Sequence, residues 1–383
     1  MTELTVLGGG IGGLTAALTL SHHGLAAHVL ERAPDLSEIG AGLQISPNGR
    51  VVFDALGLGP SLDKAGIRAR GVRLIDGPTG RDVAWVPLRQ KPYLLLHRAD
   101  LIDILAAAVG KAGIPLHLGA EVTQIETGTH VQLTFADGRT ERATRLIGAD
   151  GLHSVARNAV CPGLTPRFTG QVAWRAILPS IRQEPPEVQV HLGSGRHLVR
   201  YPLRGGACVN IVAVEEREDW AAEGWHHLDD PANLARAFSG FAPAIRDELD
   251  RIDRPYLWGL HRHAVAPHWH NGAVILLGDA AHPTLPFLAQ GANMAIEDAW
   301  VLASCLSDGT GPAHYQRLRK SRTTRIIDAA QANATHYHLH PGPKRRAAHA
   351  ALHLASALAP QLLTARYGWL YNHDVTKPPS SIS

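Results

Sequence analysis

The glycines near the N-terminus are the first residues of this sequence whose spacing suggests chemistry. Gly8, Gly10 and Gly13 follow the order G-x-G-x-x-G, directly after the apolar run 4–7. A glycine at the second position lets the backbone approach a pyrophosphate, which the free N–H groups at the start of a helix attract. Glu31, 18 residues after Gly13, is placed to bind ribose hydroxyls, unless it is only an exposed acid at a strand end. The spacing predicts a dinucleotide site, for either NAD or FAD.

Two aspartates occur in similar contexts later in the chain. Asp150 follows the short apolar run 146–149, and Asp279 follows the run 274–278. Ligands of open α/β sheets bind at the carboxyl ends of the strands, which is where both aspartates are expected to lie. The two carboxylates are therefore candidates for further contacts with the same ligand.

A histidine and a tyrosine are the best candidates for acid–base chemistry. His197 and Tyr201 are four residues apart in a predicted strand, so their side chains share one face. A base with a pKa near neutrality can remove the proton of a phenol and make its ring more nucleophilic. The alternative is that both side chains lie on the solvent face of a hairpin. No G-x-S-x-G, H-E-x-x-H or C-x-x-C motif occurs in the sequence, so redox chemistry would depend on a bound cofactor.

Two kinds of β-structure are expected to position these residues. The segment 4–30 reads as strand, glycine turn, helix and strand, the βαβ unit that binds dinucleotides. An antiparallel meander is predicted from three short apolar runs, 187–192, 197–201 and 207–214. The segment 72–86 predicts a smaller hairpin of the same type, and the pattern from residue 291 to about residue 366 is helical.

The composition is that of an ordinary globular protein without a strong charge bias. The chain has 383 residues, of which 45% are hydrophobic, and its formal net charge is +3. A dedicated nucleic-acid binder would carry a larger basic excess, so no nucleic-acid partner is expected. Three widely spaced cysteines favour a reduced, cytoplasmic chain. With no signal-peptide pattern and no apolar run of 18 residues, we expect neither secretion nor a membrane span.

Taken together, the motifs resemble those of the FAD-dependent aromatic hydroxylases, the single-component flavoprotein monooxygenases that include salicylate and 3-hydroxybenzoate hydroxylases. The resemblance covers nearly the whole chain, and its landmarks are the segments 8–13, 40–48, 97–101, 148–157, 278–283 and 289–293. It implies an α/β fold: a Rossmann-like FAD-binding domain with a parallel sheet, an interleaved antiparallel β-sheet substrate domain and C-terminal helices. The expected ranges are 1–70, 97–165 and 260–305 for the FAD-binding domain, 71–96 and 166–259 for the substrate domain, and 306–383 for the helices.

The resemblance also implies which residues hold FAD. In this family the fingerprint and Glu31 hold the ADP half, Arg98 and the backbone near Val122 support it, and Asp279 holds the ribityl chain. The segment at Asp150 is associated with both FAD and the nicotinamide donor. A helix that begins at residue 291 would present free N–H groups to the flavin and stabilise its anionic reduced form. The expected set is Gly8, Gly10, Gly12, Gly13, Glu31, Arg32, Arg98, Val122, Asp150, Asp279, Gly291, Ala292 and Asn293.

The function implied is FAD-dependent hydroxylation of a small aromatic, a phenolic acid, through a flavin C4a-hydroperoxide. Dioxygen would be consumed, and NADH or NADPH would bind transiently, because only one dinucleotide fingerprint is present. His197 and Tyr201 would assist substrate deprotonation, as in relatives that act on 3-hydroxybenzoate or 6-hydroxynicotinate. Two alternatives stay open: a flavin oxidase or reductase on the same fold, and a non-catalytic flavin-binding redox sensor.

Three further residues are expected in the substrate pocket: Gln44, Pro286 and Phe287. Pro286 and Phe287 could equally belong to the plain core. Enzymes that act on 6-hydroxynicotinate resemble this chain but carry histidines at the positions of Gln44 and Phe287, which argues against a pyridine substrate.

Three remaining patterns have simpler explanations. His336, His338 and His340 alternate like metal ligands, but they lie in a helical stretch, so no metal is expected. The basic run 317–325 is expected to form a solvated helix face. The Ala-rich segment 347–363 fits either a packed tail or the interface of a homodimer.

Overall fold

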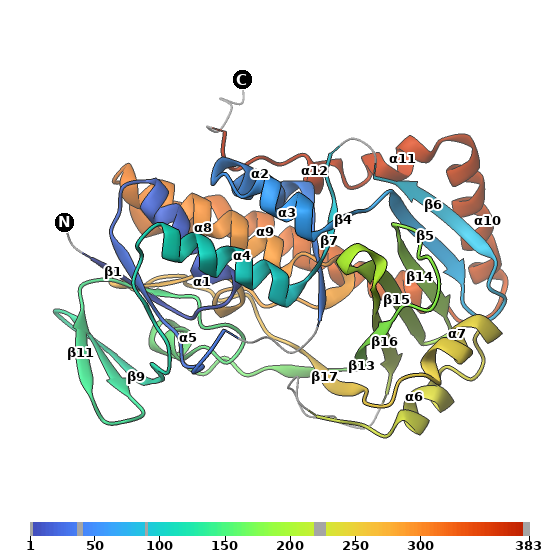
Figure 1. Cartoon of the computed structure of the whole chain (residues 1–383), viewed down its shortest axis with the longest axis horizontal. Coiled ribbons are helices and arrows are strands. Elements are labelled where there is room, and N and C mark those ends of the chain that lie inside the picture. Colours follow the sequence, from blue (N-terminus) through green and yellow to red (C-terminus); the bar gives the residue numbers. More distant parts are fainter. Residues whose placement is uncertain (1–2, 37–40, 89–90, 218–226, 378–383) are drawn as a thin grey trace.

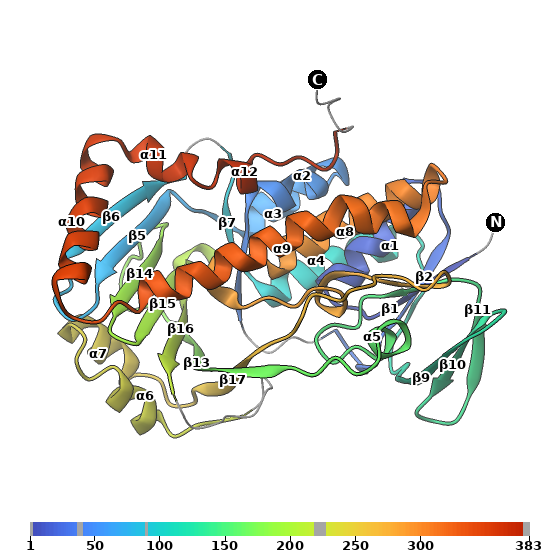
Figure 2. The ribbon, with the colours of Figure 1, turned by 180° about the vertical axis from the view of Figure 1, so that it is seen from behind.

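The chain folds into two sheet-based parts that lie side by side and are joined by long helices (Figure 1). The structure is a computed structural model that describes residues 3–36, 41–88, 91–217 and 227–377. Gly40, the first residue of the landmark 40–48, lies outside the described residues. Helix α9 (Gly311–Tyr337) runs along both parts and is best seen from behind (Figure 2). Among the helices of the described chain, none is long and apolar enough to cross a membrane.

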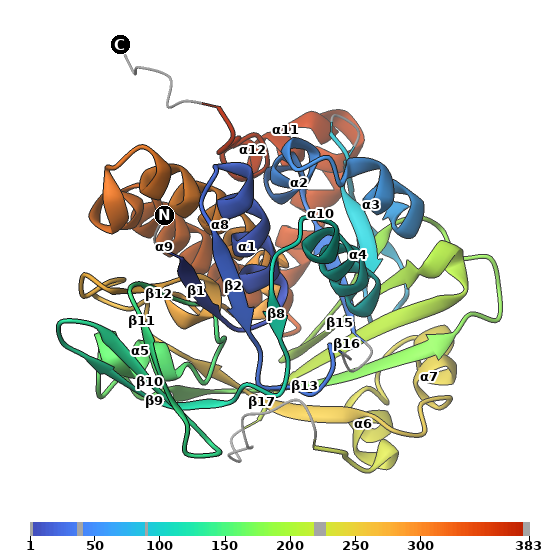
Figure 3. The ribbon, with the colours of Figure 1, turned by 60° about the vertical axis from the view of Figure 1, so that its left-hand side comes forward.

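The first part is built on a parallel sheet with the strand order β18-β12-β1-β2-β8. Its strands are β1 (Leu4–Leu7), β2 (Ala27–Leu30), β8 (Leu116–His117), β12 (Leu146–Gly148) and β18 (Val274–Leu276). Over one face lie α1 (Ile11–His22), α4 (Arg98–Lys111) and α8 (Gly291–Ser307) (Figure 3). On the other side lies a small sheet of β9 (Val122–Thr127), β10 (Val131–Phe135) and β11 (Thr140–Ala143). With both faces covered, β1, β12 and β18 are buried throughout.

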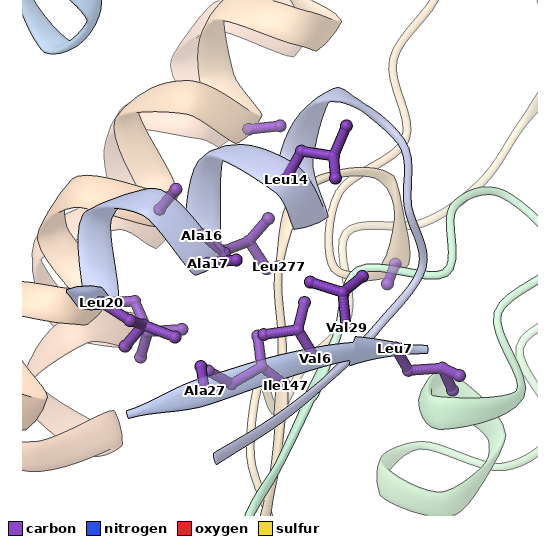
Figure 4. Close-up of a cluster of buried hydrophobic side chains, with 14 of the residues drawn as sticks. Val6, Leu7, Leu14, Ala16, Ala17, Leu20, Ala27, Val29, Ile147 and Leu277 are labelled. Atoms are coloured by element: carbon purple, nitrogen blue, oxygen red, sulfur yellow. The ribbon is translucent and has the colours of Figure 1, made fainter. Parts of the chain in front are cut away.

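The core of this part lies between the parallel sheet and α1 (Figure 4). Val6, Val29 and Ile147 project from the sheet, and Leu14 and Ala17 of the helix belong to the same cluster of buried side chains. All five side chains are fully buried. This packing fixes the start of α1 at the carboxyl end of β1. The predicted βαβ unit is confirmed, with both strands at the expected residues.

Shorter elements connect the parallel strands. An antiparallel sheet of order β3-β7-β4 contains β3 (Gly42–Ile45), β4 (Ile67–Arg68) and β7 (Leu94–His97). The short helices are α2 (Pro47–Ala55), α3 (Gly59–Ala65) and α5 (Val155–Val160). Two 3-10 turns, η2 (Gly278–Ala280) and η3 (Pro286–Leu288), lie between β18 and α8. Strand β3 reaches the second part, where the Gly42 N–H donates to Asn210 Oδ1 over 2.7 Å.

The second part is a seven-stranded sheet of order β17-β13-β16-β15-β14-β5-β6. Its strands are β5 (Gly71–Asp76), β6 (Asp82–Pro87), β13 (Arg167–Pro179), β14 (Val188–Gly193), β15 (Arg196–Leu203), β16 (Cys208–Glu216) and β17 (Tyr256–Arg262). The antiparallel meander is confirmed as β14, β15 and β16. The hairpin predicted at 72–86 is confirmed as the antiparallel pair β5 and β6, and β5 joins it to the meander by pairing with β14 in parallel. Parallel pairing needs a long crossover, and the chain between β6 and β14 supplies one through the first part.

Helices cover this sheet and close the chain. Helices α6 (Pro231–Ala237) and α7 (Pro243–Leu249) pack over the face that carries Trp174 and Leu198. The turn η1 (Arg204–Gly206) joins β15 to β16. The chain ends in α10 (Pro343–Leu358), α11 (Pro360–Ala365) and α12 (Gly368–Tyr371), and both α10 and α11 contact β6. Their outer side exposes three leucines, Leu354, Leu358 and Leu362.

The expectation that the basic run 317–325 forms a solvated helix face is wrong for Arg319. Arg319 in α9 is 1% exposed and forms ion pairs with Asp298 (2.6 Å) and Glu297 (2.5 Å) of α8. Arg322 pairs with the same Glu297 over 2.7 Å. Buried charges persist only when they are paired and hydrogen-bonded, and α8 provides both carboxylates. These residues therefore fasten α9 to α8.

Candidate active site

A cavity of about 270 Å³ lies where the two parts meet. Strands β14, β15 and β16 supply one wall, β3 a second wall, and the loop from Thr284 to Gly291 a third. Tyr337 at the end of α9 and Tyr371 of α12 also line the cavity. A concave apolar space with a few polar groups between two structural units is the usual form of a small-molecule site.

Strand β15 directs its side chains alternately into this cavity and into the opposite core. His197, Val199 and Tyr201 line the cavity. Leu198 packs in the core beneath α6 and α7, and Arg200 forms an ion pair with Glu248 of α7 over 2.8 Å. The shared face of His197 and Tyr201 is therefore the cavity side, and the solvent-face alternative is wrong.

The imidazole of His197 is held on three sides by aromatic rings. Its ring centroid lies 5.1 Å from Tyr337, 5.6 Å from Phe287 and 4.9 Å from His338. His197 Nδ1 is 2.7 Å from His338 Nε2. Burial, followed by the proximity of His338, lowers the pKa of His197 well below its usual value. The ring is therefore neutral near pH 7 with one unprotonated nitrogen, and its pKa is lower than the value near neutrality expected for the base.

Tyr201 lies beside β3. A Cβ atom at Gly42 would come within 2.7 Å of the Tyr201 hydroxyl, so only glycine permits this approach. Burial raises the pKa of Tyr201, while Arg175 and a hydrogen bond with Gln44 act in the opposite direction. The phenol therefore stays protonated and can donate a hydrogen bond.

Arg175 of β13 brings a positive charge to the cavity and was not singled out in the sequence. Its guanidinium lies over the ring of Trp258, 4.0 Å from the centroid. Burial lowers the pKa of Arg175 to about 9, with Tyr201 acting in the opposite direction and the neighbouring Arg98 adding to the decrease, and the guanidinium is still charged at neutral pH. A charged residue on one face of the otherwise apolar run 172–178 was the signal that could have identified it.

The three predicted pocket residues all line the cavity. Gln44 accepts a hydrogen bond from the Tyr93 hydroxyl over 2.7 Å. Pro286 and Phe287 form the turn η3, and Phe287 also belongs to a core cluster with Leu288 and Ala330. The pocket and core explanations of Phe287 therefore both apply.

The glycine fingerprint has the geometry of a phosphate cradle. Gly8 has φ +110°, and a Cβ there would lie 2.4 Å from the Ala149 carbonyl oxygen. A Cβ on Gly12 would come within 3.0 Å of Leu277, whereas a Cβ on Gly10 would meet no atom within 4 Å. The loop is thus closely packed below and open above Gly10, as a pyrophosphate site requires.

Glu31 lies directly beside this loop. Its carboxylate accepts hydrogen bonds from the Gly9 N–H and from the Ala33 N–H, the second over 2.8 Å. The side chain therefore shapes the loop in the protein itself. Its predicted contact with a ribose remains a prediction.

The start of α8 and Asp279 meet at the cavity. The first backbone hydrogen bond of the helix runs from the Met294 N–H to the Gln290 carbonyl over 2.8 Å. Among the described residues no side chain caps the helix, so the N–H groups of residues 291–293 have no helical partner. A Cβ on Gly291 would lie 3.9 Å from Asp279 Oδ1. Burial raises the pKa of Asp279, and among the neighbouring groups His282 opposes this increase most strongly. A positive helix end and a carboxylate therefore face one space.

Asn293 has a structural task in addition to its backbone position. Its side-chain amide donates to the carbonyl oxygens of Gln44 and Ala289, both over 2.9 Å, and its Oδ1 accepts from the Ser46 N–H over 3.0 Å. Ala292 and Arg98 line the cavity near it. The amide thus ties β3 to the first turn of α8.

Besides the fingerprint glycines, Glu31 and Asn293, three more of the predicted cofactor residues lie outside the cavity lining. Asp150 accepts hydrogen bonds from Ser154 Oγ (2.6 Å) and the Ala156 N–H (3.0 Å) and so holds the start of α5. Val122 begins β9 and pairs with Phe135, while Arg32 is exposed beyond β2. Their proposed contacts with FAD concern the part of the molecule around the fingerprint.

His338 is a residue whose position the sequence did not reveal. It follows α9, is buried, and contacts His197 as described above. His336 instead bonds the Ala332 carbonyl, and His340 bonds Ser194 Oγ over 2.7 Å, so the three histidines do not converge. In the described part of the chain, no three His, Cys, Asp or Glu side chains are grouped as metal ligands.

Comparison with known proteins agrees with these features. The family described as FAD binding domain matches residues 1–333. The chain is 35% identical to the 3-amino-4-hydroxybenzoate 2-monooxygenase of Streptomyces cremeus, covering 99% of this chain and 97% of the relative. It is also 35% identical to 3-hydroxybenzoate 6-hydroxylase 1 of Aquipseudomonas alcaligenes, over 85% and 86% of the two chains. A salicylate hydroxylase solved with its substrate superposes with a TM-score of 0.82 at 25% identity, covering 98% and 96%.

The chain belongs to the family of FAD-dependent aromatic hydroxylases. It is an oxidoreductase of the flavoprotein monooxygenase type, and FAD is its cofactor. The open space above Gly10, the carboxylate of Asp279 and the uncapped start of α8 fit this group, because a pyrophosphate, ribityl hydroxyls and an electron-rich flavin need these partners.

Proposed function

We propose that the protein hydroxylates a small phenolic acid in this cavity, with NADH or NADPH as transient donor and dioxygen as second substrate. The observation that carries the proposal is that His197, Tyr201 and Arg175 surround one cavity. A neutral imidazole suits a phenolic proton, and a guanidinium suits a carboxylate. The compounds in the names of the relatives have both groups: 3-amino-4-hydroxybenzoate, 3-hydroxybenzoate and salicylate each carry a hydroxyl group and a carboxylate on one benzene ring.

The size of the cavity favours a single aromatic ring. Its volume of about 270 Å³ is below the roughly 300 Å³ at which sites for drug-sized ligands begin. Asp279 and Gly291, which we propose as contacts of the cofactor, line the same space, so the substrate has only part of this volume.

The side chains of the cavity divide the work of binding and proton transfer. When bound, FAD supplies reducing equivalents from the donor and the activated oxygen for the ring. His197 accepts the phenolic proton at Nε2, and Tyr201 donates a hydrogen bond to the substrate oxygen. Arg175 orients the carboxylate and stabilises the negative charge that develops when the phenol ionises. Apolar residues such as Val199 and Phe287 exclude water.

The proposal also covers the domains, the cellular location and the oligomeric state. The FAD-binding domain comprises residues 1–70, 97–165 and 260–305 around the parallel sheet, and the substrate domain comprises residues 71–96 and 166–259; strand β17 of the seven-stranded sheet extends past this boundary to Arg262. The protein is cytoplasmic, in keeping with the free thiols of Cys161, Cys208 and Cys305. It forms a homodimer through the leucines exposed on α10 and α11, which sedimentation velocity would test.

The decisive experiment is a screen of hydroxybenzoates for stimulated NAD(P)H oxidation, followed by labelling with ¹⁸O₂. We expect at least one compound to accelerate oxidation and to yield a product that contains one atom of labelled oxygen. Rapid NAD(P)H oxidation without labelled product would favour an oxidase or reductase. Absence of stimulation by every compound would favour a sensor.

A further inference from the structure

Three hydrogen-bonded side chains form a row that leads from the cavity to the surface. His197 Nδ1 lies 2.7 Å from His338 Nε2, and His338 Nδ1 lies 2.7 Å from Glu216 Oε1. His197 is 1% exposed and the side chain of His338 3%, whereas the side chain of Glu216 is 44% exposed. Glu216 and His338 also line a second hollow, of about 580 Å³, on the outer side. This row of side chains therefore has one end at the substrate site and the other end in water.

The backbone holds these side chains in register. The Gly195 N–H donates to the His338 carbonyl over 3.3 Å, and the Glu216 N–H donates to the Gly195 carbonyl over 2.8 Å. The turn before β15 thus binds both the residue after α9 and the end of β16. His338 lies 122 residues after Glu216 in the sequence, so the alignment is a property of the tertiary structure.

The carboxylate determines which ring nitrogens carry protons. Glu216 can only accept, so His338 donates from Nδ1–H and its Nε2 becomes an acceptor. His197 must then donate from Nδ1–H, which leaves its Nε2 without a proton. This is the tautomer that a base in the cavity needs.

We propose that His338 and Glu216 are positioning residues that relay the phenolic proton of the substrate from His197 to solvent. The inference rests on the proposed hydroxylation of a phenolic acid and extends it to residues outside the cavity. It explains how a base that is almost completely buried can release the proton it accepts.

The proton transfers balance without a permanent charge. The substrate O–H bond breaks and its proton binds His197 Nε2, while the Nδ1 proton of His197 passes to His338 Nε2. The Nδ1 proton of His338 passes to Glu216, which releases a proton to water. Both rings stay neutral and change tautomer. When the product oxygen is reprotonated, the same transfers in reverse restore the starting tautomers.

The electrostatics of the surroundings agree with transfer between neutral rings. Burial lowers the pKa of both histidines. Glu216 raises the pKa of His338, while Arg196 and His340 lower it. The groups that face the pair are the rings of Tyr337 and Phe287 on one side, and Glu216, Arg196 and His340 on the outer side.

The test measures how fast bound substrate ionises. The FAD-loaded enzyme is mixed with the hydroxybenzoate that wild type hydroxylates, and phenolate formation is followed by ultraviolet absorption in a stopped-flow instrument. For Glu216→Gln and His338→Gln we expect a rate about 10-fold lower or more at pH 6–7, given that a lost general base typically costs 10²- to 10⁴-fold. The deficit should shrink toward pH 9, where solvent ionises the phenol.

Two variants serve as controls. Glu215→Gln changes a neighbouring carboxylate that pairs with Arg196 and Arg217. Glu215 does not belong to the row formed by His197, His338 and Glu216, so wild-type rates are expected. Glu216→Asp should restore part of the rate. If His338→Gln does not fold, Glu216→Gln at its partly exposed position carries the test. Wild-type rates in Glu216→Gln at pH 6–7 would overturn the relay.

A second measurement does not depend on the substrate. In ¹⁵N-histidine-labelled protein, with assignments from the His197→Gln and His338→Gln variants, we expect both rings to be protonated at Nδ1. Protonation of His197 at Nε2 would overturn the relay. If no hydroxybenzoate is hydroxylated but both rings carry Nδ1–H, the proposed function fails while the tautomer order stands.

Discussion

The carbonyl oxygen of Gly8 lies so close to the Cα of Gly13 that a Cβ atom on Gly13 would be only 1.8 Å away from it. Gly13 in the first turn of α1 thus packs directly on the loop that follows β1. At Gly10, two residues further along the same loop, a Cβ would meet nothing within 4 Å. Two glycines of one motif therefore serve different purposes: one permits close packing and the other leaves space.

This difference predicts opposite outcomes for the same substitution. Gly10→Val should yield folded protein without FAD, because the branched side chain occupies the space for the pyrophosphate. Gly13→Val should lower stability or prevent folding, because its Cβ would overlap Gly8. Circular dichroism, thermal unfolding and the flavin absorbance of the purified proteins distinguish the two outcomes. Gly128→Val, at a hairpin position that is also open, should remain folded and yellow. A yellow Gly10→Val protein would contradict the assignment of the pyrophosphate site.

The sequence predicted the structure best where the interactions are local. The βαβ unit depends on residues within one short segment, and the strands of the meander depend on neighbouring runs, so both were visible as patterns. The alternation at His197 and Tyr201 predicted a shared face, but not which side of the sheet would be covered. That was decided by β3 and the loop before α8, which come from distant segments.

Long-range partners explain the errors. Arg319 looked like one of several solvated cations, because its carboxylate partners lie 21 and 22 residues earlier on another helix. His338 looked like one of three alternating histidines, because its contact with His197 spans 141 residues. In both cases the charge or ring pattern of the local sequence is the same for the exposed and for the buried arrangement.

The buried ion pairs of Arg319 predict a large effect on stability. Arg319→Met leaves Glu297 and Asp298 with fewer partners in the core, so the free energy of unfolding should fall by about 3–5 kcal/mol at pH 7. Urea unfolding followed by circular dichroism would measure this. Arg139→Met, on an exposed hairpin, should cause no measurable change. Equal stability of the two variants would contradict the role assigned to Arg319.

The same network predicts how this loss depends on pH. Although burial raises it, the net pKa of Asp298 is lowered, chiefly by His282 and Arg319. In wild type, Asp298 therefore contributes stability above its unfolded pKa of about 4, and this contribution is lost as the pH falls through the lower folded pKa. Removal of Arg319 raises the pKa of Asp298 in the folded state. Protonation of Asp298 then removes the cost of burying its unpaired charge. The stability difference between Arg319→Met and wild type should narrow from pH 7 to pH 5; a constant difference would contradict this electrostatic origin.

The charge of Arg175 predicts substrate selectivity. Arg175→Met should raise the KM for the hydroxybenzoate substrate by about 10- to 100-fold, the range expected when a hydrogen bond to a charged group is lost. The matching phenol without a carboxylate should be affected far less. Arg167→Met, an exposed position on the same strand β13, is the control and should behave as wild type. Equal effects on both substrates would show that Arg175 acts on packing and not on a carboxylate.

The cavity base predicts the pH dependence of the reaction. Because burial lowers the pKa of His197, the wild-type ring stays neutral at pH values where a free imidazole becomes protonated, so the acid limb of the rate should lie below pH 6.5.

His197→Ala should keep FAD, since the residue lies in β15 away from the fingerprint, but should hydroxylate 10²- to 10⁴-fold more slowly near pH 7, as is typical of a lost general base. The deficit should shrink at higher pH, where solvent removes the phenolic proton. Tyr201→Phe should show a smaller loss, because the ring remains and only the hydroxyl is removed. Rates of product formation from pH 6 to pH 9 test these expectations, and normal hydroxylation by His197→Ala at pH 7 would mean that another group in the cavity removes the proton.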